Sequence, residues 1–194
     1  MTAPAVVRGA AERTVPGHVH AEQLNGAITP PESKLSPPVV HSVAMGQSGI
    51  AHRGELLRTA GLGSCVAIVI IAPAQRLAVL AHCILPTRDD PSQPAARYID
   101  TAVPALLALL RDAGARAPLA AVLVGGASMF PGLDGQSSRD IAGDNIRAAR
   151  QALANAAIPL RSEALGGTVG RSVVVDPTTQ RVLVHTIRSG DRYL

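Results

Sequence analysis

Two apolar runs of this sequence lie almost end to end: Cys65–Ala72 and Arg76–Leu85, separated only by Pro73-Ala74-Gln75. Both runs are rich in Val, Ile and Leu, a composition typical of buried strands. We therefore expect the two runs to pair as an antiparallel β-hairpin. Any fold of this chain has to place that hairpin in its core.

Other segments of similar composition predict further strands, and two longer segments predict helices. The strand candidates do not alternate regularly with the helices, which argues against a doubly wound nucleotide-binding fold. We expect an α+β layered domain in which two helices pack on several hairpins. The additional strands are expected at Leu119–Val124, Ser172–Asp176 and Arg181–Ile187, with weaker candidates at Ser42–Met45 and Glu55–Thr59. The helices are expected at Ala95–Ala113, which contains Pro104, and at Arg139–Ala156, with Ile141, Ile146, Ala149 and Leu153 near one face.

The chain divides into two parts by composition. Residues 1–40 are proline-rich and show no sustained periodicity, so we interpret them as a flexible Pro-rich N-terminal extension. Residues 41–194 have the pattern of one compact domain. At 194 residues and 47% hydrophobic content the chain can bury one core.

Charge and composition exclude several function classes. The net charge is +4, but the arginines are scattered, Lys34 is the single lysine, and aromatic residues make up 2% of the chain. Single-strand nucleic-acid binders need aromatic platforms, so we expect no nucleic-acid partner, and an anionic protein suits the charge better. No run approaches the ~18 apolar residues of a membrane span, and Met1–Ala10 shows no secretory signal. With only two cysteines, these features predict a cytoplasmic protein without direct membrane insertion.

A cysteine and a histidine lie at one end of the expected hairpin. Cys65 follows the glycine-rich turn Gly61-Leu62-Gly63-Ser64, and His82 lies in the second apolar run. A hairpin centred between Pro73 and Ala74 places Cys65 opposite His82, with Cβ atoms about 4.5–5.5 Å apart. An adjacent imidazolium would lower the pKa of the thiol and so create a nucleophile.

Three nearby residues could complete such a site. Thr59 could accept the imidazole N–H and orient the base. Backbone N–H groups around Gly63 and Ser64 could bind a developing oxyanion. The spacing alone leaves alternatives open: Cys65 could be a small buried hydrophobe, His82 a structural residue, or Cys65 and Cys83 a disulfide. Because side chains alternate along a strand, however, Cys83 faces away if His82 faces Cys65.

The chain contains several short motifs, in the order Thr59-Ala60-Gly61-Leu62-Gly63-Ser64-Cys65-Val66, His82-Cys83-Ile84-Leu85-Pro86, Tyr98-Ile99-Asp100, Gly125-Gly126-Ala127-Ser128-Met129-Phe130, Gly143-Asp144-Asn145 and Gly166-Gly167-Thr168-Val169-Gly170-Arg171. Together they resemble the bacterial chemoreceptor glutamine deamidase family, CheD. The resemblance covers about residues 41–190. The sequence departs from the family pattern at Val122 and Val124, which precede Gly-Gly-Ala, and at Asp144, where the family often has Arg.

The resemblance implies a fold, an activity and a set of roles. The fold would be a single-domain α/β/β sandwich. The activity would be that of a protein-glutamine glutaminase, which converts receptor glutamines to glutamate through a thioester and releases ammonia. The nucleophile would be Cys65, the base His82 and the orienting residue Thr59, with no cofactor and no metal. The partners would be methyl-accepting chemotaxis receptors and, as for some members, the CheC phosphatase. A non-catalytic adaptor that binds receptors or CheC is the alternative.

Overall fold

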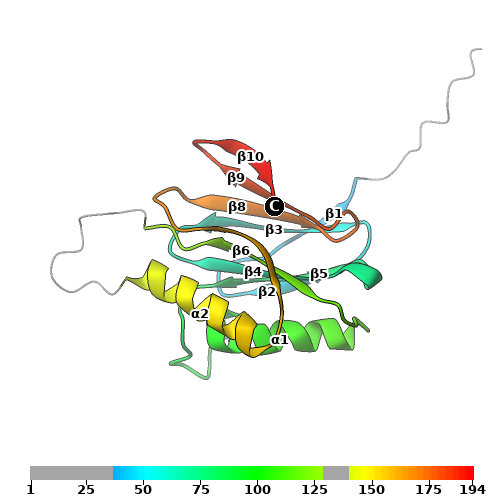
Figure 1. Ribbon diagram of the computed structural model, residues 1–194, viewed down its shortest axis with the longest axis horizontal. Helices are drawn as coiled ribbons and strands as arrows, with labels where there is room; N and C mark the ends of the chain where they lie inside the picture. The colour runs from blue at the N-terminus through cyan, green and yellow to red at the C-terminus, as the bar shows by residue number, and fades with distance from the viewer. Residues whose placement is uncertain (1–36, 129–139) are drawn as a thin grey trace, which may run out of the picture. The chain divides into compact units, whose positions relative to one another are not determined.

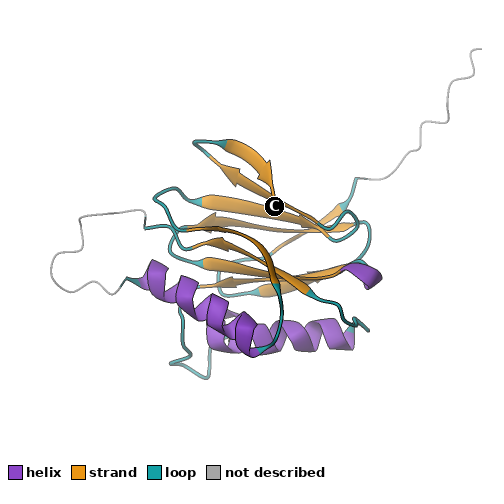
Figure 2. Cartoon of the chain, in the orientation of Figure 1, coloured by secondary structure: helices purple, strands orange, loops and turns teal. Residues whose placement is uncertain are grey.

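The computed structural model describes residues 37–128 and 140–194, which form a three-layer α/β/β arrangement (Figure 1). Two helices cover one face of a five-stranded sheet, and a second five-stranded sheet covers its other face (Figure 2). The expected α+β layered sandwich is confirmed. The first part of the extension, residues 1–36, lies outside the described residues.

The sheet in the middle of the sandwich, called here the inner sheet, has the strand order β2-β5-β4-β6-β7. The outer sheet has the order β1-β3-β8-β9-β10. The inner-sheet strands are β2 (Ser48–Ala51), β4 (Val66–Ala72), β5 (Leu77–Cys83), β6 (Ala120–Gly125) and β7 (Leu160–Leu165). The outer-sheet strands are β1 (Val39–Ser42), β3 (Glu55–Leu62), β8 (Arg171–Asp176), β9 (Arg181–Thr186) and β10 (Gly190–Tyr193). The first two residues of β1, Val39 and Val40, belong to the segment assigned to the extension.

Strands β4 and β5 are completely buried because both faces of the inner sheet are covered. Alternate residues of β4 supply two different cores. Val66, Ile68 and Ile70 pack with the helices, whereas Ala67 and Val69 pack against the outer sheet. This two-sided burial explains why these strands have unbroken apolar runs in the sequence.

The register of this hairpin differs from the expected one. The structure pairs Val66 with Cys83 and Ala67 with His82, so Cys65 and His82 are diagonal neighbours and not opposite each other. The reason is the turn, which is one residue longer than the apparent break. Arg76 adopts a left-handed conformation (φ 53°) and closes the short 3-10 turn Pro73–Gln75 instead of beginning the second strand.

Helices α1 (Ile99–Asp112) and α2 (Ile141–Asn155) form the third layer. The expected first helix is wrong at its start, because Ala95–Arg97 is a separate 3-10 turn before α1. Residue 139, the expected start of the second helix, lies outside the described residues, and α2 is capped by the Asp140 carboxylate, which accepts from Gly143 N. Ile141 was expected on the buried face but is exposed, whereas Ala142 and Asn145 are buried.

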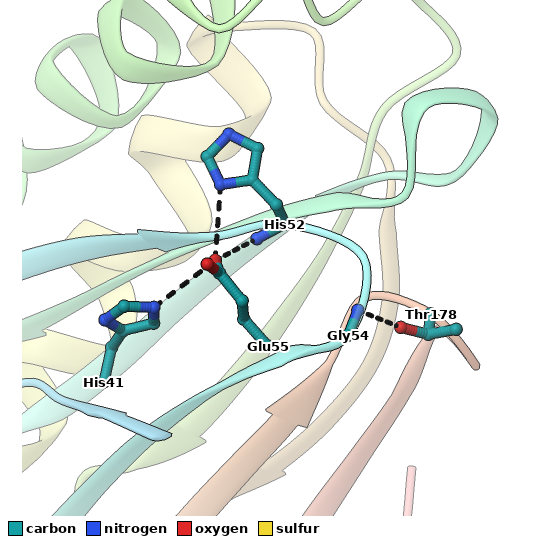
Figure 3. Close-up of polar contacts among 5 residues, drawn as sticks. All are labelled: His41, His52, Gly54, Glu55 and Thr178. Carbon is teal, nitrogen blue, oxygen red and sulfur yellow. Dashed lines mark hydrogen bonds and ion pairs between the residues drawn. The ribbon is translucent and has the colours of Figure 1, made fainter. Parts of the chain in front are cut away.

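The entry of the chain into the outer sheet is held by polar contacts (Figure 3). Glu55 at the start of β3 lies 3.3 Å from His41 of β1 and 3.3 Å from His52, and it accepts the His52 backbone N–H at 2.8 Å. That backbone hydrogen bond is the main reason why the pKa of Glu55 lies below its usual value. In the adjacent turn, Gly54 N donates to Thr178 Oγ1 at 2.8 Å.

Candidate active site

Thr59 lies in β3 beside an irregularity of that strand. Thr59 pairs with Val173, but Leu62 pairs with Arg171, so β3 holds one extra residue between the two pairs. This is a β-bulge, a feature that bends a strand and redirects its side chains. Gly61 within it has φ 74°, a conformation that glycine adopts without strain. The bulge lets the outer sheet present Thr59 to the inner sheet and then lead into the turn that carries Cys65.

The side chains of Thr59 and His82 form a buried hydrogen-bonded relay. Thr59 Oγ1 donates to the Val43 carbonyl at 2.8 Å and lies 2.8 Å from His82 Nδ1. Because the hydroxyl has a single proton and gives it to the carbonyl, it accepts the Nδ1–H of the imidazole. This assigns the neutral His82 tautomer with a lone pair on Nε2. Both residues are buried, with exposed fractions of 3% and 1%.

The Nε2 atom of His82 has no hydrogen-bond partner within the described parts of the chain. A buried and unpaired ring nitrogen is unusual in a structural histidine. Here it is the basic atom of the ring, and it lies on the same face of the inner sheet as Cys65. A nitrogen of this kind can accept a proton from a nearby thiol.

Cys65 lies in the turn between β3 and β4, one residue before β4 begins. Its side chain belongs to the core between the two sheets, on the same sheet face as Ala67 and His82. Diagonal neighbours on one face of an antiparallel pair have Cα atoms about 7–8 Å apart, within reach of a long side chain such as histidine. The two candidate residues therefore lie on one sheet face as diagonal neighbours, one step away from the expected pairing.

Three consecutive carbonyls fix the backbone of the Cys65 turn. The Gly63 carbonyl accepts from Ala127 N at 2.7 Å, and the Cys65 carbonyl accepts from Gly126 N at 2.8 Å. The Ser64 carbonyl accepts from the side chain of Asn145 at 3.0 Å. The turn is therefore held by the end of β6 and by helix α2 and has little freedom of its own.

Gly125 and Gly126 make this close approach sterically feasible. A Cβ atom on Gly125, which has φ 121°, would lie 2.2 Å from the Cys65 carbonyl oxygen. A Cβ on Gly126 would lie 2.5 Å from Ile146 Cγ1. The glycine pair therefore supports the turn that carries the candidate nucleophile. The Gly125 carbonyl also accepts from Gly166 N, in the motif Gly166-Gly167, at 3.0 Å.

The N–H groups expected to bind an oxyanion are only partly available. Gly63 N already donates to the Gly61 carbonyl at 3.0 Å, so the expectation for Gly63 as a donor is wrong. The N–H groups of Ser64 and Cys65 remain as candidates, because no turn or loop carbonyl of the described residues accepts them. The Cys65 N–H lies beside its own sulfur, where it favours the thiolate.

Burial is the main cause of the pKa shifts of Cys65 and His82. It raises the pKa of the Cys65 thiol, against smaller opposing effects of the Cys65 N–H and of Arg97. Burial also lowers the pKa of His82 below its usual value. Both shifts favour the uncharged forms, a neutral thiol and a neutral imidazole, over a thiolate–imidazolium pair. In this state the unpaired Nε2 of His82 is able to accept a proton.

Cys83 faces the opposite side of the inner sheet from Cys65. It is fully buried in the core beneath the helices, and burial raises its pKa far above the usual value. Both cysteines are free thiols, which excludes the disulfide alternative. The expectation that Cys83 is a core residue is confirmed.

A groove of about 530 Å³ between α1 and α2 lies on the helix-covered side of the molecule. None of Thr59, Cys65 and His82 lines this groove. Cys65 itself is only 7% exposed. No helix of residues 37–128 and 140–194 is long and apolar enough to cross a membrane.

Comparison with known proteins identifies the family. The family described as "CheD chemotactic sensory transduction" matches residues 84–186, more than half of the chain. The chain belongs to the CheD family. The "Chemoreceptor glutamine deamidase CheD" of Halalkalibacterium halodurans is 33% identical over 157 residues, which cover 79% of this chain and 97% of that protein.

Other members of the CheD family have a similar sequence identity to this chain. The "Probable chemoreceptor glutamine deamidase CheD" of Symbiobacterium thermophilum is 37% identical over 80% of this chain and 97% of its own length. The protein of the same description from Methanococcus vannielii is 37% identical over 79% of this chain and 97% of its own length. Among solved structures, the Bacillus licheniformis hypothetical protein YfiH aligns with a TM-score of 0.38 and 16% identity, over 64% of this chain and 58% of that one.

Proposed function

We propose that this CheD-family chain is a chemoreceptor glutamine deamidase with Cys65 as its nucleophile, His82 as its general acid and base, and Thr59 as the residue that orients His82. The observation that carries the proposal is the buried relay from the Val43 carbonyl through Thr59 to His82. It leaves the unpaired Nε2 of the ring on the sheet face that holds the Cys65 thiol. Relatives that are 33% and 37% identical over about four fifths of this chain have the same described activity.

In the first half of the reaction, Cys65 Sγ attacks the carboxamide carbon of a glutamine side chain while His82 Nε2 takes the thiol proton. The carbonyl oxygen gains the negative charge, and the N–H of Cys65 is the proposed donor that stabilises it. His82 then gives its proton to the amide nitrogen. The carbon–nitrogen bond breaks, ammonia leaves, and a thioester remains on Cys65.

In the second half, water replaces ammonia at the same position. His82 Nε2 takes a proton from water as its oxygen attacks the thioester carbon. The carbon–sulfur bond breaks, the sulfur recovers the proton from His82, and the new carboxylic acid gives its remaining proton to solvent to become a glutamate side chain. The proton transfers at the nucleophile, the water and the leaving group pass through His82, so these steps need no cofactor.

The glutamine is proposed to belong to a chemoreceptor and not to be the free amino acid. A free amino acid would need groups that bind its carboxylate and its amine. The Cys65 side chain is largely buried, so the proposed substrate is a side chain that extends into the site from a protein surface. The net charge of +4 also favours an acidic protein partner over a cationic one.

The test is mass spectrometry of a purified chemoreceptor incubated with this chain. Amide-to-acid conversion at receptor glutamines and release of ammonia are expected with the unsubstituted chain and with Cys83→Ala, but not with Cys65→Ala. Free glutamine in a parallel reaction should remain unchanged. An unmodified receptor together with turnover of free glutamine would contradict the proposal in favour of a small-molecule amidase.

The same experiment addresses the adaptor alternative. A non-catalytic adaptor would bind the receptor equally well with Cys65→Ala and would release no ammonia in either form. CheC is proposed as a second partner, following the resemblance of this chain to family members that bind it. Co-purification of this chain with CheC, carried out with and without receptor present, tests CheC binding separately from deamidation.

A further inference from the structure

Asn145 is a fully buried amide that contacts the turn before the proposed nucleophile. Its Nδ2 donates to the Ser64 carbonyl at 3.0 Å and to the Ile84 carbonyl at 2.8 Å. Carbonyl oxygens only accept hydrogen bonds, so the atom that faces them has to be the amide nitrogen. One side chain of α2 therefore joins the residue before Cys65 to the residue that follows β5.

These two carbonyls lie where the β4–β5 ladder ends. The last pair of the ladder is Val66 with Cys83. Beyond it, the N–H groups of Ile84 and Leu85 both donate to the Arg97 carbonyl, so this part of the chain pairs with Arg97 and not with the residues before β4. The Asn145 amide supplies the link that the strand ladder no longer provides.

The position of Asn145 in α2 would suit an apolar residue. Asn145 lies on the same buried face as Ala142, Ala149 and Leu153, and its exposed fraction is 0%. Its Oδ1 has no hydrogen-bond partner among the residues that the structure describes. A buried polar group that is only half paired costs stability relative to an apolar side chain, which indicates a role beyond packing.

Peptide geometry connects this amide to the reaction. The Ser64–Cys65 peptide is trans and planar, so its C=O and its N–H point in opposite directions. Because Asn145 holds the Ser64 carbonyl toward α2, the Cys65 N–H points away from α2. The carbon attacked by Cys65 carries the oxyanion next to the sulfur, within reach of this N–H.

We infer that Asn145 is a positioning residue that aims the Cys65 N–H at the oxyanion by holding the Ser64 carbonyl. This inference rests on the proposed deamidase function of the same site. Asn145 touches neither the substrate nor the reacting atoms in this account. Its effect should therefore appear in the chemical step and in the properties of Cys65, not in receptor binding.

The test compares Asn145→Ala with Asn155→Ala, an exposed asparagine at the end of the same helix. With receptor as substrate, Asn145→Ala should lower kcat on the order of 10-fold to 100-fold, with KM changed less than 2-fold, as for a disturbed oxyanion donor. The pH midpoint for alkylation of Cys65 by iodoacetamide should also move upward, since the N–H that favours the thiolate is displaced. Asn155→Ala should change neither quantity.

A second variant covers the case in which Asn145→Ala does not fold. Asn145→Asp has the same shape, and its protonated acid can donate to one carbonyl, whereas its carboxylate repels both. The activity of Asn145→Asp relative to the unsubstituted chain should therefore fall as pH rises from 6 to 8. Equal kcat and equal alkylation midpoints in folded Asn145→Ala and Asn155→Ala, or a flat Asn145→Asp ratio, would overturn the inference. If the unsubstituted chain releases no ammonia, the proposed function fails, and the alkylation midpoints still decide the role of Asn145.

Discussion

Thr59 Oγ1 lies 2.8 Å from His82 Nδ1 and gives its own proton to the Val43 carbonyl. This contact joins the two sheets, since Thr59 belongs to β3 of the outer sheet and His82 to β5 of the inner sheet. It also decides which nitrogen of the ring is basic. In the proposed mechanism the threonine therefore acts through the tautomer and the orientation of His82, without contacting the substrate.

Replacing Thr59 with Val or with Ser separates these contributions. Thr59→Val preserves the shape of the side chain but removes the acceptor for the Nδ1–H of His82. The imidazole can then change tautomer or rotate, so that Nε2 is no longer available as the basic nitrogen. We expect kcat to fall by about 10-fold or more, since general-base catalysis contributes about 10²-fold to 10⁴-fold in total. Thr59→Ser keeps the hydroxyl and should retain most of the activity. Ammonia release with receptor as substrate measures both.

Stability gives the control for these variants. Thr59→Val leaves the Val43 carbonyl and the His82 N–H buried without partners, which should lower the free energy of unfolding by about 1–3 kcal/mol. Activities are therefore compared only at temperatures where urea unfolding shows both variants to be folded. Equal kcat values for the Val and Ser variants would remove Thr59 from the mechanism.

The pKa directions predict how the reactivity of Cys65 depends on pH. Burial raises the pKa of Cys65 and lowers that of His82, so at neutral pH the thiol keeps its proton and the imidazole is uncharged. Alkylation by iodoacetamide should be slow at pH 7 and should increase with a midpoint above the ordinary thiol value of about 8.5. His82→Asn should leave this midpoint nearly unchanged. A midpoint below pH 7 that is lost in His82→Asn would indicate a thiolate–imidazolium pair instead.

Much of the fold could be predicted from the sequence because its central strands are buried on both faces. The unbroken apolar runs at β4, β5 and β6 were recognised, as were β3, β8 and β9. The strands that were not recognised are the four sheet edges: β1, β2, β7 and β10. Edge strands have one neighbour only, so they need no apolar run. Strand β1 begins three residues before the segment Ser42–Met45 that was expected there.

The site was predictable in its residues but not in its geometry. Thr59 and His82 are in hydrogen-bond contact and Cys65 lies on the same sheet face as His82, whereas the hairpin register was wrong because the left-handed Arg76 lengthens the turn. Asn145 was not identified because its role depends on two carbonyls that are distant in sequence. The sequence does place Asn145 four residues before Ala149, a spacing that puts both on one face of a helix. A polar residue at such a position is nevertheless easily assigned to the solvent-exposed surface.

Cys83 should make the protein lose stability in alkaline solution. Its folded-state pKa is raised by complete burial, whereas an unfolded cysteine ionises near pH 8.5. Above that pH the unfolded chain releases a proton that the folded chain keeps, so stability falls by about 1.4 kcal/mol per pH unit for such a group. Cys83→Ala should therefore show a flatter decline between pH 8.5 and 10 in urea unfolding. Parallel declines for Cys83→Ala and the unsubstituted chain would contradict this account.

Gly125 should be far less tolerant of a side chain than Gly54, although both have positive φ angles. A Cβ on Gly125 would lie 2.2 Å from the Cys65 carbonyl oxygen, whereas a Cβ on Gly54 would meet nothing within 4 Å. Gly54→Ala should therefore cost only backbone strain, about 1–2 kcal/mol, within the usual range for an unfavourable conformation. Gly125→Ala should add overpacking against backbone atoms that cannot rotate away, for a total of about 3 kcal/mol or more.

The effect on activity should separate the two glycine variants more clearly than stability does. Any shift of β6 that relieves the clash moves the Gly126 N–H away from the Cys65 carbonyl, and with it the turn that holds the nucleophile. Folded Gly125→Ala should therefore lose deamidation and show a changed rate of Cys65 alkylation, while Gly54→Ala keeps both. Urea unfolding and ammonia release at a temperature where both variants are folded provide the comparison. Full activity in Gly125→Ala would mean that the contact between β6 and the turn does not position Cys65.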